Sequence, residues 1–125
     1  MRPDAHNAAW LWDMLEYAQE VASFVHRRTY EEYESERMLR RAVERCVLVI
    51  GEAANRISGE FRGAHPAVPW QAIVVRRHRL VHDYDEFVDE KIWAIARVHV
   101  PVLMDWLRWV LPTPPPDPLP EGQDA

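Results

Sequence analysis

The chain has 125 residues, of which 48% are hydrophobic, 28% are charged and only 4 are glycines, and this composition indicates one globular domain that favours helices. The net charge of −5 argues against a broadly basic nucleic-acid surface, but it leaves room for a small local one. Because Cys46 is the one cysteine and no apolar run approaches the length of a membrane span, we expect a cytoplasmic protein without disulfides, signal peptide or membrane contact.

The first predicted helix extends from about Asp4 to about His26. Its apolar residues recur at steps of three and four, which is the spacing of one helix face. They are Trp10, Leu11, Met14, Leu15, Ala18, Val21, Ala22 and Val25. Beyond this helix, Thr29 and Glu32 have the spacing of a capping box, which predicts a short helical turn that ends near Ser35.

The next predicted helix carries an apolar seam whose residues are spaced alternately by four and three. They are Leu39, Val43, Cys46, Ile50, Ala53 and Ile57. Cys46 is therefore predicted to be a core residue. Gly51 lies within this helix and indicates close approach by a neighbouring helix, since glycine lowers helix propensity by about 1 kcal/mol relative to alanine. Gly59 and Gly63 mark the end of the helix, and residues 62–69 are predicted to form a loop.

Two further helices are predicted after this loop. The first begins near Trp70, with Pro69 as its initial residue, carries the basic stretch and is interrupted by the acidic turn at 83–86. The last runs from about Asp89 to Leu111 and is kinked by Pro101. Its apolar face consists of Ile92, Ile95, Ala96, Leu103, Trp106, Leu107 and Val110.

The short predicted loops favour an all-α antiparallel bundle of four main helices over residues 1–111. Residues 112–125 read PTPPPDPLPEGQDA, in which proline recurs too often for a packed element. We expect this segment to be a disordered proline-rich tail.

The stretch RRHRLVHDY at 76–84 concentrates three arginines and two histidines in an acidic chain. Histidine transfers protons near neutral pH, and an arginine guanidinium matches the geometry of a phosphate. Together they suit phosphodiester cleavage without a metal, in which a base activates a ribose 2′-hydroxyl. On a straight helix Arg77 and His82 are roughly 140° apart. Joining them therefore requires a distorted helix or a second copy of the stretch across a two-fold axis.

Two other interpretations of this stretch remain open. Arginine-rich helix faces are commonly solvated and paired with acids, and His82 and Tyr84 are then core or interface residues. The second alternative is a zinc site that combines His78 and His82 with nearby aspartates. However, Arg79 occupies the position where the zincin pattern requires glutamate, and the neighbouring arginines repel a cation. We therefore expect neither a metal nor another cofactor.

Several blocks of the sequence resemble the HepT family of HEPN-domain proteins over about residues 8–111. They are IGEAANRIS at 50–58, HPAVPW at 65–70, RHRLVHDY at 77–84 and IW at 92–93. The family motif is an arginine, a polar residue, three further residues, then histidine, any residue and tyrosine. It corresponds here to Arg77, His78, His82 and Tyr84. His78 stands where HepT-like sequences usually have asparagine, whereas other polar residues occur there in HEPN domains more widely.

The resemblance implies a four- to five-helix HEPN bundle that forms a homodimer. It also implies the toxin of a type II or type VII-like toxin–antitoxin pair, which acts by metal-independent RNA cleavage. The antitoxin is a cognate minimal nucleotidyltransferase that neutralises the toxin by transferring AMP to the motif tyrosine. Carried onto this chain, Arg77 and His82 are the catalytic candidates and Tyr84 is the AMP acceptor. The candidate contacts to RNA phosphates are Arg76, His78 and Arg79.

A second hypothesis is a non-catalytic HEPN protein that serves as the substrate-binding or regulatory partner of a nucleotidyltransferase. The acidic net charge and the absence of an extended basic stripe favour it, because both imply weak general affinity for RNA. The presence of Arg77, His82 and Tyr84 favours the ribonuclease. Glu52, within IGEA, is a polar residue on a mostly apolar helix, and an arginine of the motif is its candidate partner.

Overall fold

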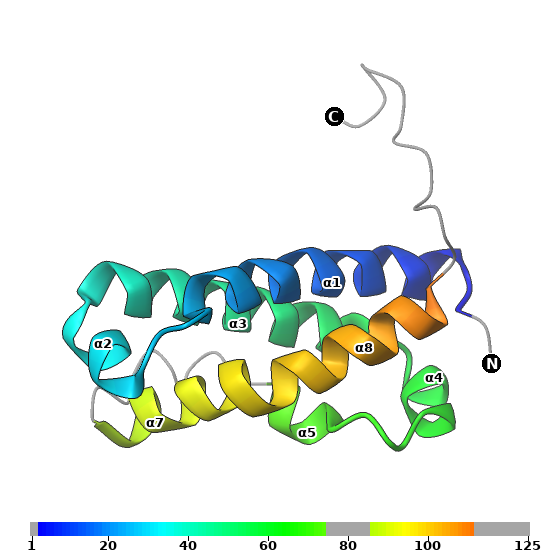
Figure 1. Cartoon of the computed structure of the whole chain (residues 1–125). Coiled ribbons are helices and arrows are strands. Elements are labelled where there is room, and N and C mark those ends of the chain that lie inside the picture. Colours follow the sequence, from blue (N-terminus) through cyan, green and yellow to red (C-terminus); the bar gives the residue numbers. More distant parts are fainter. Residues whose placement is uncertain (1–2, 75–85, 112–125) are drawn as a thin grey trace, which may run out of the picture.

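Every regular element in residues 3–74 and 86–111, the parts of the chain that the computed structural model describes, is a helix. The elements are α1 (Ala5–Val25), α2 (Tyr30–Ser35), α3 (Arg37–Arg56), α4 (Gly59–Ala64), α5 (Trp70–Ile73), α7 (Glu86–Ala94), the π-helical turn η1 (Ile95–His99) and α8 (Val100–Val110). α1 lies beside α3 and beside α8 and runs antiparallel to both (Figure 1). The predicted all-α bundle is therefore confirmed.

α1 begins and ends within one residue of its predicted limits. The Asp4 carboxylate accepts a hydrogen bond from the backbone N–H of Asn7 at 2.8 Å, and so caps the first turn. The predicted apolar face is turned into the core, where Trp10 and Ala22 are half-buried and the other members are buried.

α2 confirms the predicted capping box. The Thr29 hydroxyl accepts from the backbone N–H of Glu32 at 3.2 Å, and the Glu32 carboxylate accepts from the backbone N–H of Thr29 at 3.1 Å. This reciprocal pair satisfies two amides that the start of a helix leaves unpaired. The short helix ends at Ser35, as predicted, and buries Tyr33 completely.

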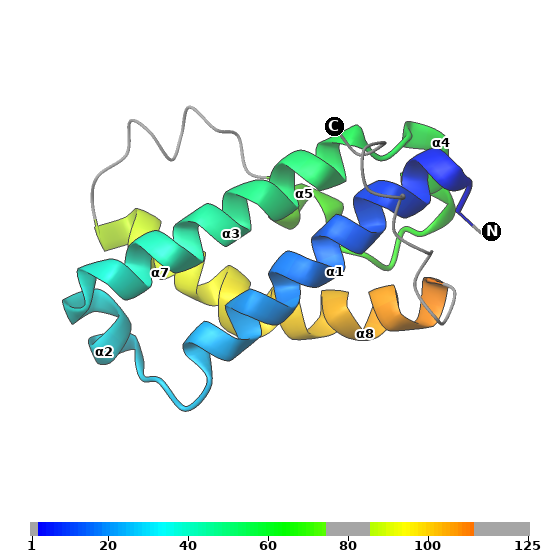
Figure 2. The ribbon, with the colours of Figure 1, turned by 90° about the horizontal axis from the view of Figure 1, so that it is seen from above.

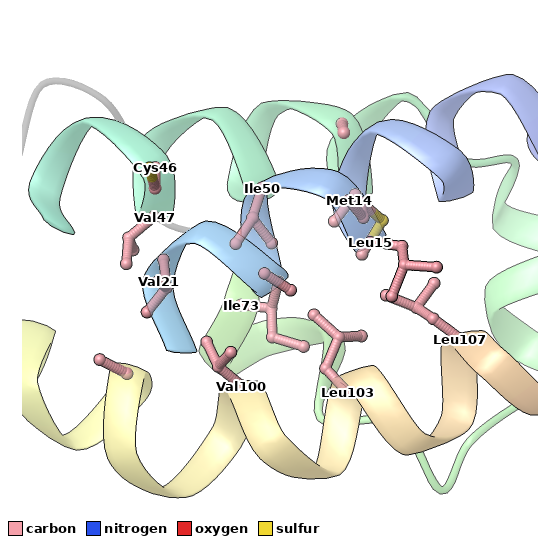
Figure 3. Packing of buried hydrophobic residues seen from close by; sticks show 14 of the residues in the cluster. Met14, Leu15, Val21, Cys46, Val47, Ile50, Ile73, Val100, Leu103 and Leu107 are labelled. Carbon is pink, nitrogen blue, oxygen red and sulfur yellow. The ribbon is translucent and has the colours of Figure 1, made fainter. Parts of the chain in front are cut away.

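α3 turns its predicted seam into the core. Leu39 is half-buried, and the remaining seam residues, from Val43 to Ile57, are buried. Figure 3 shows side chains from α1, α3, α5 and α8 meeting in one apolar cluster, in which Ile50 and Ile73 lie near Leu103. Because burial of each such aliphatic side chain contributes about 1.5–3 kcal/mol, this cluster provides much of the driving force for folding.

The last helix contains a π-helical turn directly before its proline. In η1 the backbone N–H of Val100 bonds to the carbonyl of Ile95, and Pro101 lies in the first turn of α8. In a regular α-helix the Pro101 ring would clash with the carbonyl four residues earlier, and the wider π turn relieves that clash. The chain changes direction between α7 and α8 (Figure 2), where a kink was predicted. The helix begins at Glu86, earlier than expected.

The segment before the basic stretch differs from the prediction in two respects. Residues 62–64, expected in a loop, form the end of α4, because Ser58 caps this helix and Phe61 is buried beneath it. The helix that starts at Trp70 ends at Ile73, since Val74 has the non-helical angles φ −74° and ψ 90°. The expected continuation of this helix into the basic stretch is thus interrupted at Val74, where two β-branched valines follow each other.

Residues 1–2, 75–85 and 112–125 lie outside the described residues. Of the acidic turn predicted at 83–86, Glu86 instead begins α7, and residues 83–85 are not described. The predicted disordered tail and the domain limit between 1–111 and 112–125 stay predictions. Among residues 3–74 and 86–111, no helix combines the length and the apolar character that a membrane span requires.

Candidate functional site

All of the predicted site residues fall in the segment 75–85, outside the described residues. They are Arg76, Arg77, His78, Arg79, His82 and Tyr84. Their relative placement stays a prediction, and the alternative zinc site at His78 and His82 is untested for the same reason. The structure does describe the two elements between which this segment is attached, α5 before it and α7 after it.

Both of these elements pack against α3 (Figure 2). At the end of α5, Ile73 is buried in the core and Val74 packs half-buried against it. The backbone N–H of Val74 donates to the carbonyl of Trp70 at 2.8 Å. The chain therefore enters the 75–85 segment from a fixed point beside α3 and leaves it at α7, which also contacts α3.

A first aromatic cluster fixes α5 against α4 and α8. The Trp70 indole N–H donates to the carbonyl of His65 at 3.0 Å, and the Trp70 ring meets Trp106 edge to face with centroids 5.6 Å apart. The His65 ring centroid lies 4.5 Å from that of Phe61 and 5.3 Å from that of Trp106. Such aromatic pairs contribute about 0.5–1.5 kcal/mol each beyond area burial, so these three helices act as one unit.

His65 and Trp70 have no predicted functional role, and HPAVPW entered only as a block of resemblance. The sequence nevertheless contains a signal for an ordered loop at this place. Pro66 and Pro69 restrict the backbone, and a tryptophan follows directly. His65 is buried, with 9% of its surface exposed. The structure thus identifies HPAVPW as the loop that positions the start of residues 75–85, the motif segment.

A second aromatic cluster fixes α7. The Trp93 ring centroid lies 5.1 Å from that of Tyr33 and 6.0 Å from that of Tyr30, and both tyrosines belong to α2. The Arg97 guanidinium stacks 5.5 Å from the centroid of the Trp93 ring and donates to the carbonyl of Val25 at 3.4 Å. Burial, assisted by nearby carboxylates, raises the pKa of Tyr33, and it raises the pKa of Tyr30 to about 12. Both phenols are therefore neutral at physiological pH.

α3 carries two residues that the sequence analysis singled out. Cys46 is buried, as predicted, and burial raises the pKa of its thiol to about 11. The thiol is thus protonated near neutral pH and is a core group rather than a nucleophile. Glu52 is exposed, and its candidate partner, an arginine of the motif, lies outside the described residues.

The exposed side of α3 is basic, which the sequence analysis did not recognise. The helix holds five arginines, namely Arg37, Arg40, Arg41, Arg45 and Arg56, against the two acids Glu44 and Glu52. Arg41 is paired with Glu44 at 3.2 Å, while Arg37 and Arg45 are exposed on the same side. By contrast, α1 contains three acids and no lysine or arginine. The acidic chain thus concentrates positive charge on the helix that holds both ends of the motif segment.

The chain matches the family described as Ribonuclease HepT-like over residues 14–109. It is 38% identical over 93 residues to Putative RNase MJ1380 of Methanocaldococcus jannaschii, a match that covers 74% of this chain and 85% of that protein. It is 32% identical over 93 residues to Putative RNase MJ1216 of the same organism, with 74% and 77% covered. It is 27% identical over 94 residues to Probable ribonuclease HepT of Thermococcus cleftensis, with 75% and 86% covered. No solved structure matches the chain significantly.

The match to the family extends from the middle of α1 to the end of α8, so it includes both aromatic clusters and the whole motif segment. The chain belongs to the HepT-like ribonuclease family.

Proposed function

We propose that this chain is a ribonuclease toxin that cleaves RNA without a metal ion. The observation that carries the proposal is the HepT-like family match, which spans residues 14–109 and thereby includes Arg77, His82 and Tyr84. Two of the relatives bear the name Putative RNase and one the name Probable ribonuclease HepT, and these names support the same activity.

In the proposed reaction the His82 imidazole accepts the proton of a ribose 2′-hydroxyl. The 2′-oxygen forms a bond to the adjacent phosphorus, the bond from phosphorus to the 5′-oxygen breaks, and the leaving oxygen takes up a proton. Arg77 donates charge-assisted hydrogen bonds to the phosphate oxygens on which negative charge builds up. The products are a 2′,3′-cyclic phosphate and a 5′-hydroxyl, so no metal ion or oxidant is needed.

The charge distribution of α3 supports RNA as the substrate. Arg37, Arg41 and Arg45 recur every four residues, which separates them by about 6 Å along the helix and keeps them on one side. A row of cations attracts a phosphate backbone, and this attraction weakens steeply as salt rises. A strong salt dependence of RNA binding is therefore expected even though the net charge of the chain is −5.

We infer that the active form is a homodimer. On a regular helix the side chains of Arg77 and His82 point in directions roughly 140° apart. A second copy related by a two-fold axis brings the arginine of one chain towards the histidine of the other. A monomer of the printed chain mass, 14.7 kDa, at micromolar concentration in light scattering would contradict a composite site.

The proposed antitoxin is a minimal nucleotidyltransferase. We propose that both proteins act in the cytoplasm. The Tyr84 hydroxyl attacks the α-phosphorus of ATP, loses its proton, and displaces pyrophosphate, which leaves AMP on the tyrosine oxygen. The new phosphate lies two residues from His82 and carries negative charge. It competes with RNA phosphates for the arginines of the motif, so modification blocks RNA binding without unfolding the bundle.

A second candidate function is that of a non-catalytic partner of a nucleotidyltransferase. Two observations favour it, namely the net charge of −5 and the presence of His78 where HepT-like sequences usually have asparagine. A wild-type chain that binds the nucleotidyltransferase but leaves RNA intact would support this alternative.

The proposal is tested by RNA cleavage in the presence of EDTA. Wild-type protein is expected to cleave, and Arg77→Ala and His82→Ala are expected to lose about 100-fold or more of the rate. The matched control is His26→Ala, because His26 is an exposed histidine at the end of α1. Cleavage that disappears with EDTA and returns with magnesium would contradict the metal-independent mechanism.

A further inference from the structure

A shallow groove of about 620 Å³ opens between α4, the HPAVPW loop and α5. Its lining includes Arg62 and Gly63 from α4, Pro69 from the loop, and Trp70 and Gln71 from α5. α5 forms one side of the groove and ends at Ile73, immediately before the motif segment. The groove therefore lies on the path by which the chain enters that segment.

Arg62 has an unsatisfied donor at this groove. Its Nε is buried and finds no hydrogen-bond partner among residues 3–74 and 86–111. Within the described residues the structure also records no ion pair for its guanidinium. A buried donor and a partly desolvated positive charge both cost free energy when they are left unpaired. The Arg62 side chain as a whole is half-buried, so a phosphate in the groove can approach the exposed part of the guanidinium and supply the opposite charge.

The remaining lining suits a nucleobase. The Trp70 indole N–H is already used by the carbonyl of His65, and only 9% of the residue is exposed, so Trp70 adds a small apolar surface to that of the half-buried Pro69. Gln71 is exposed and presents a side-chain amide that both donates and accepts. A cation, an apolar wall and one amide match the phosphate, the flat face and the polar edge of a nucleotide.

We propose that this groove binds one nucleotide of the RNA substrate. Arg62 holds its phosphate, the wall at Pro69 and Trp70 packs against its base, and Gln71 contacts the base edge. The volume lies within the range of small-ligand sites, about 300–1,000 Å³. This inference rests on the proposed function, because it assigns a subsite to the same RNA substrate.

The groove can be filled without disturbing the fold. A Cβ atom added at Gly63 meets no atom within 4 Å, and the backbone there is helical. Gly63→Trp therefore places a large side chain in the groove, while helix propensity improves relative to glycine. Ala64→Trp is the matched control, since Ala64 is exposed on the same helix and does not line the groove. Arg62→Gln is a second, independent variant that removes the charge but keeps a polar side chain.

Binding is measured by fluorescence anisotropy with a 2′-O-methyl RNA oligonucleotide, which has no free 2′-hydroxyl and cannot be cleaved. Gly63→Trp and Arg62→Gln are expected to bind about tenfold more weakly than wild type. Ala64→Trp is expected to bind within about twofold of wild type. Circular dichroism melts establish that each variant is folded before binding is compared.

Equal affinity of Gly63→Trp and Ala64→Trp would overturn the groove assignment, even if the wild type cleaves RNA. Conversely, a wild type that binds RNA through the groove and leaves it uncut would contradict the proposed cleavage while supporting the groove. Free AMP that binds as tightly as the oligonucleotide would overturn the assignment to RNA, because the groove would then be a site for a free nucleotide.

Discussion

The side chain of Asn7 joins the start of α1 to Ser58, the cap of α4, through two hydrogen bonds. Its Nδ2 donates to the Ser58 hydroxyl oxygen at 3.2 Å, and its Oδ1 accepts from the backbone N–H of Ser58 at 3.0 Å. The same hydroxyl oxygen accepts from the backbone N–H of Phe61 at 3.2 Å and thereby caps α4. One buried amide thus holds the helix that carries Arg62 against the N-terminal end of the bundle.

Asn7→Ala is predicted to lower the free energy of unfolding by about 2 kcal/mol, because it leaves the Ser58 groups without their buried partner. Urea denaturation measures the change. The control is Asn55→Ala, since Asn55 is exposed on α3 and its loss is expected to cost less than about 0.5 kcal/mol. Equal stability of the two variants would show that the bridge between α1 and α4 contributes nothing.

Tyr33→Phe is predicted to leave stability unchanged or to raise it slightly. Tyr33 is fully buried, and its hydroxyl has no hydrogen-bond partner in the described part of the chain, so removal of the oxygen relieves an unsatisfied polar group. The ring, which packs against Trp93, is retained. Tyr33→Ala instead creates a cavity and is expected to cost about 3–5 kcal/mol. Thermal melts compare the two, and a clear loss of stability in Tyr33→Phe would reveal a hidden partner for the hydroxyl.

The raised pKa values of the two tyrosines predict a loss of stability at alkaline pH. An unfolded tyrosine releases its proton near pH 10, whereas folded Tyr30 keeps its proton until about pH 12. Between these values the folded state binds more protons, so stability falls as pH rises, and the contribution is fully present below pH 10. The double variant Tyr30→Phe/Tyr33→Phe should show a shallower fall in urea midpoint over this window. If the urea midpoint fell equally with pH in wild type and variant, the raised pKa values of Tyr30 and Tyr33 would be contradicted.

Periodic helices were predictable from the sequence, because their limits follow from local chemistry. Asp4 and the Thr29–Glu32 box fix two helix starts through side-chain caps that appear in the sequence as residue types. α4 was missed, because its cap depends on Ser58 being held by Asn7, a partner 51 residues away. The end of α5 was missed for a similar reason, since the bond from Trp70 to His65 and the burial of Ile73 are tertiary.

The candidate site likewise has residues that the sequence suggests and residues that only the fold reveals. Arg77, His82 and Tyr84 could be proposed from the sequence, because a motif is a matter of residue types and spacing, and their roles stay predictions. The unpaired Arg62 Nε and the groove beside it could not be found in that way, since an isolated arginine between two glycines gives no signal. Whether a donor lacks a partner depends on every residue packed around it, and that information exists only in the fold.

Tyr84→Phe is predicted to separate RNA cleavage from neutralisation. The phenyl ring keeps the apolar part of the side chain, so the variant should cleave RNA at close to the wild-type rate and remain toxic when expressed. It lacks the oxygen that attacks ATP in the proposed reaction, so it should gain no AMP from the cognate nucleotidyltransferase. Intact-mass measurement after incubation with the nucleotidyltransferase and ATP checks this directly. The control is Tyr17→Phe, because Tyr17 is half-buried on α1 and is expected to leave modification unchanged.

The physical cause of neutralisation can be tested with the modified protein itself. If the AMP phosphate competes with RNA for Arg77, modified wild type should bind a 2′-O-methyl oligonucleotide more weakly but melt at the same temperature. This loss of RNA affinity should become smaller as the salt concentration rises. Salt screens both the repulsion between the AMP phosphate and RNA and the attraction between Arg77 and RNA. A modified protein that melts earlier would point to local unfolding instead of charge competition. Mass gain that persists in Tyr84→Phe would show that another residue accepts the AMP.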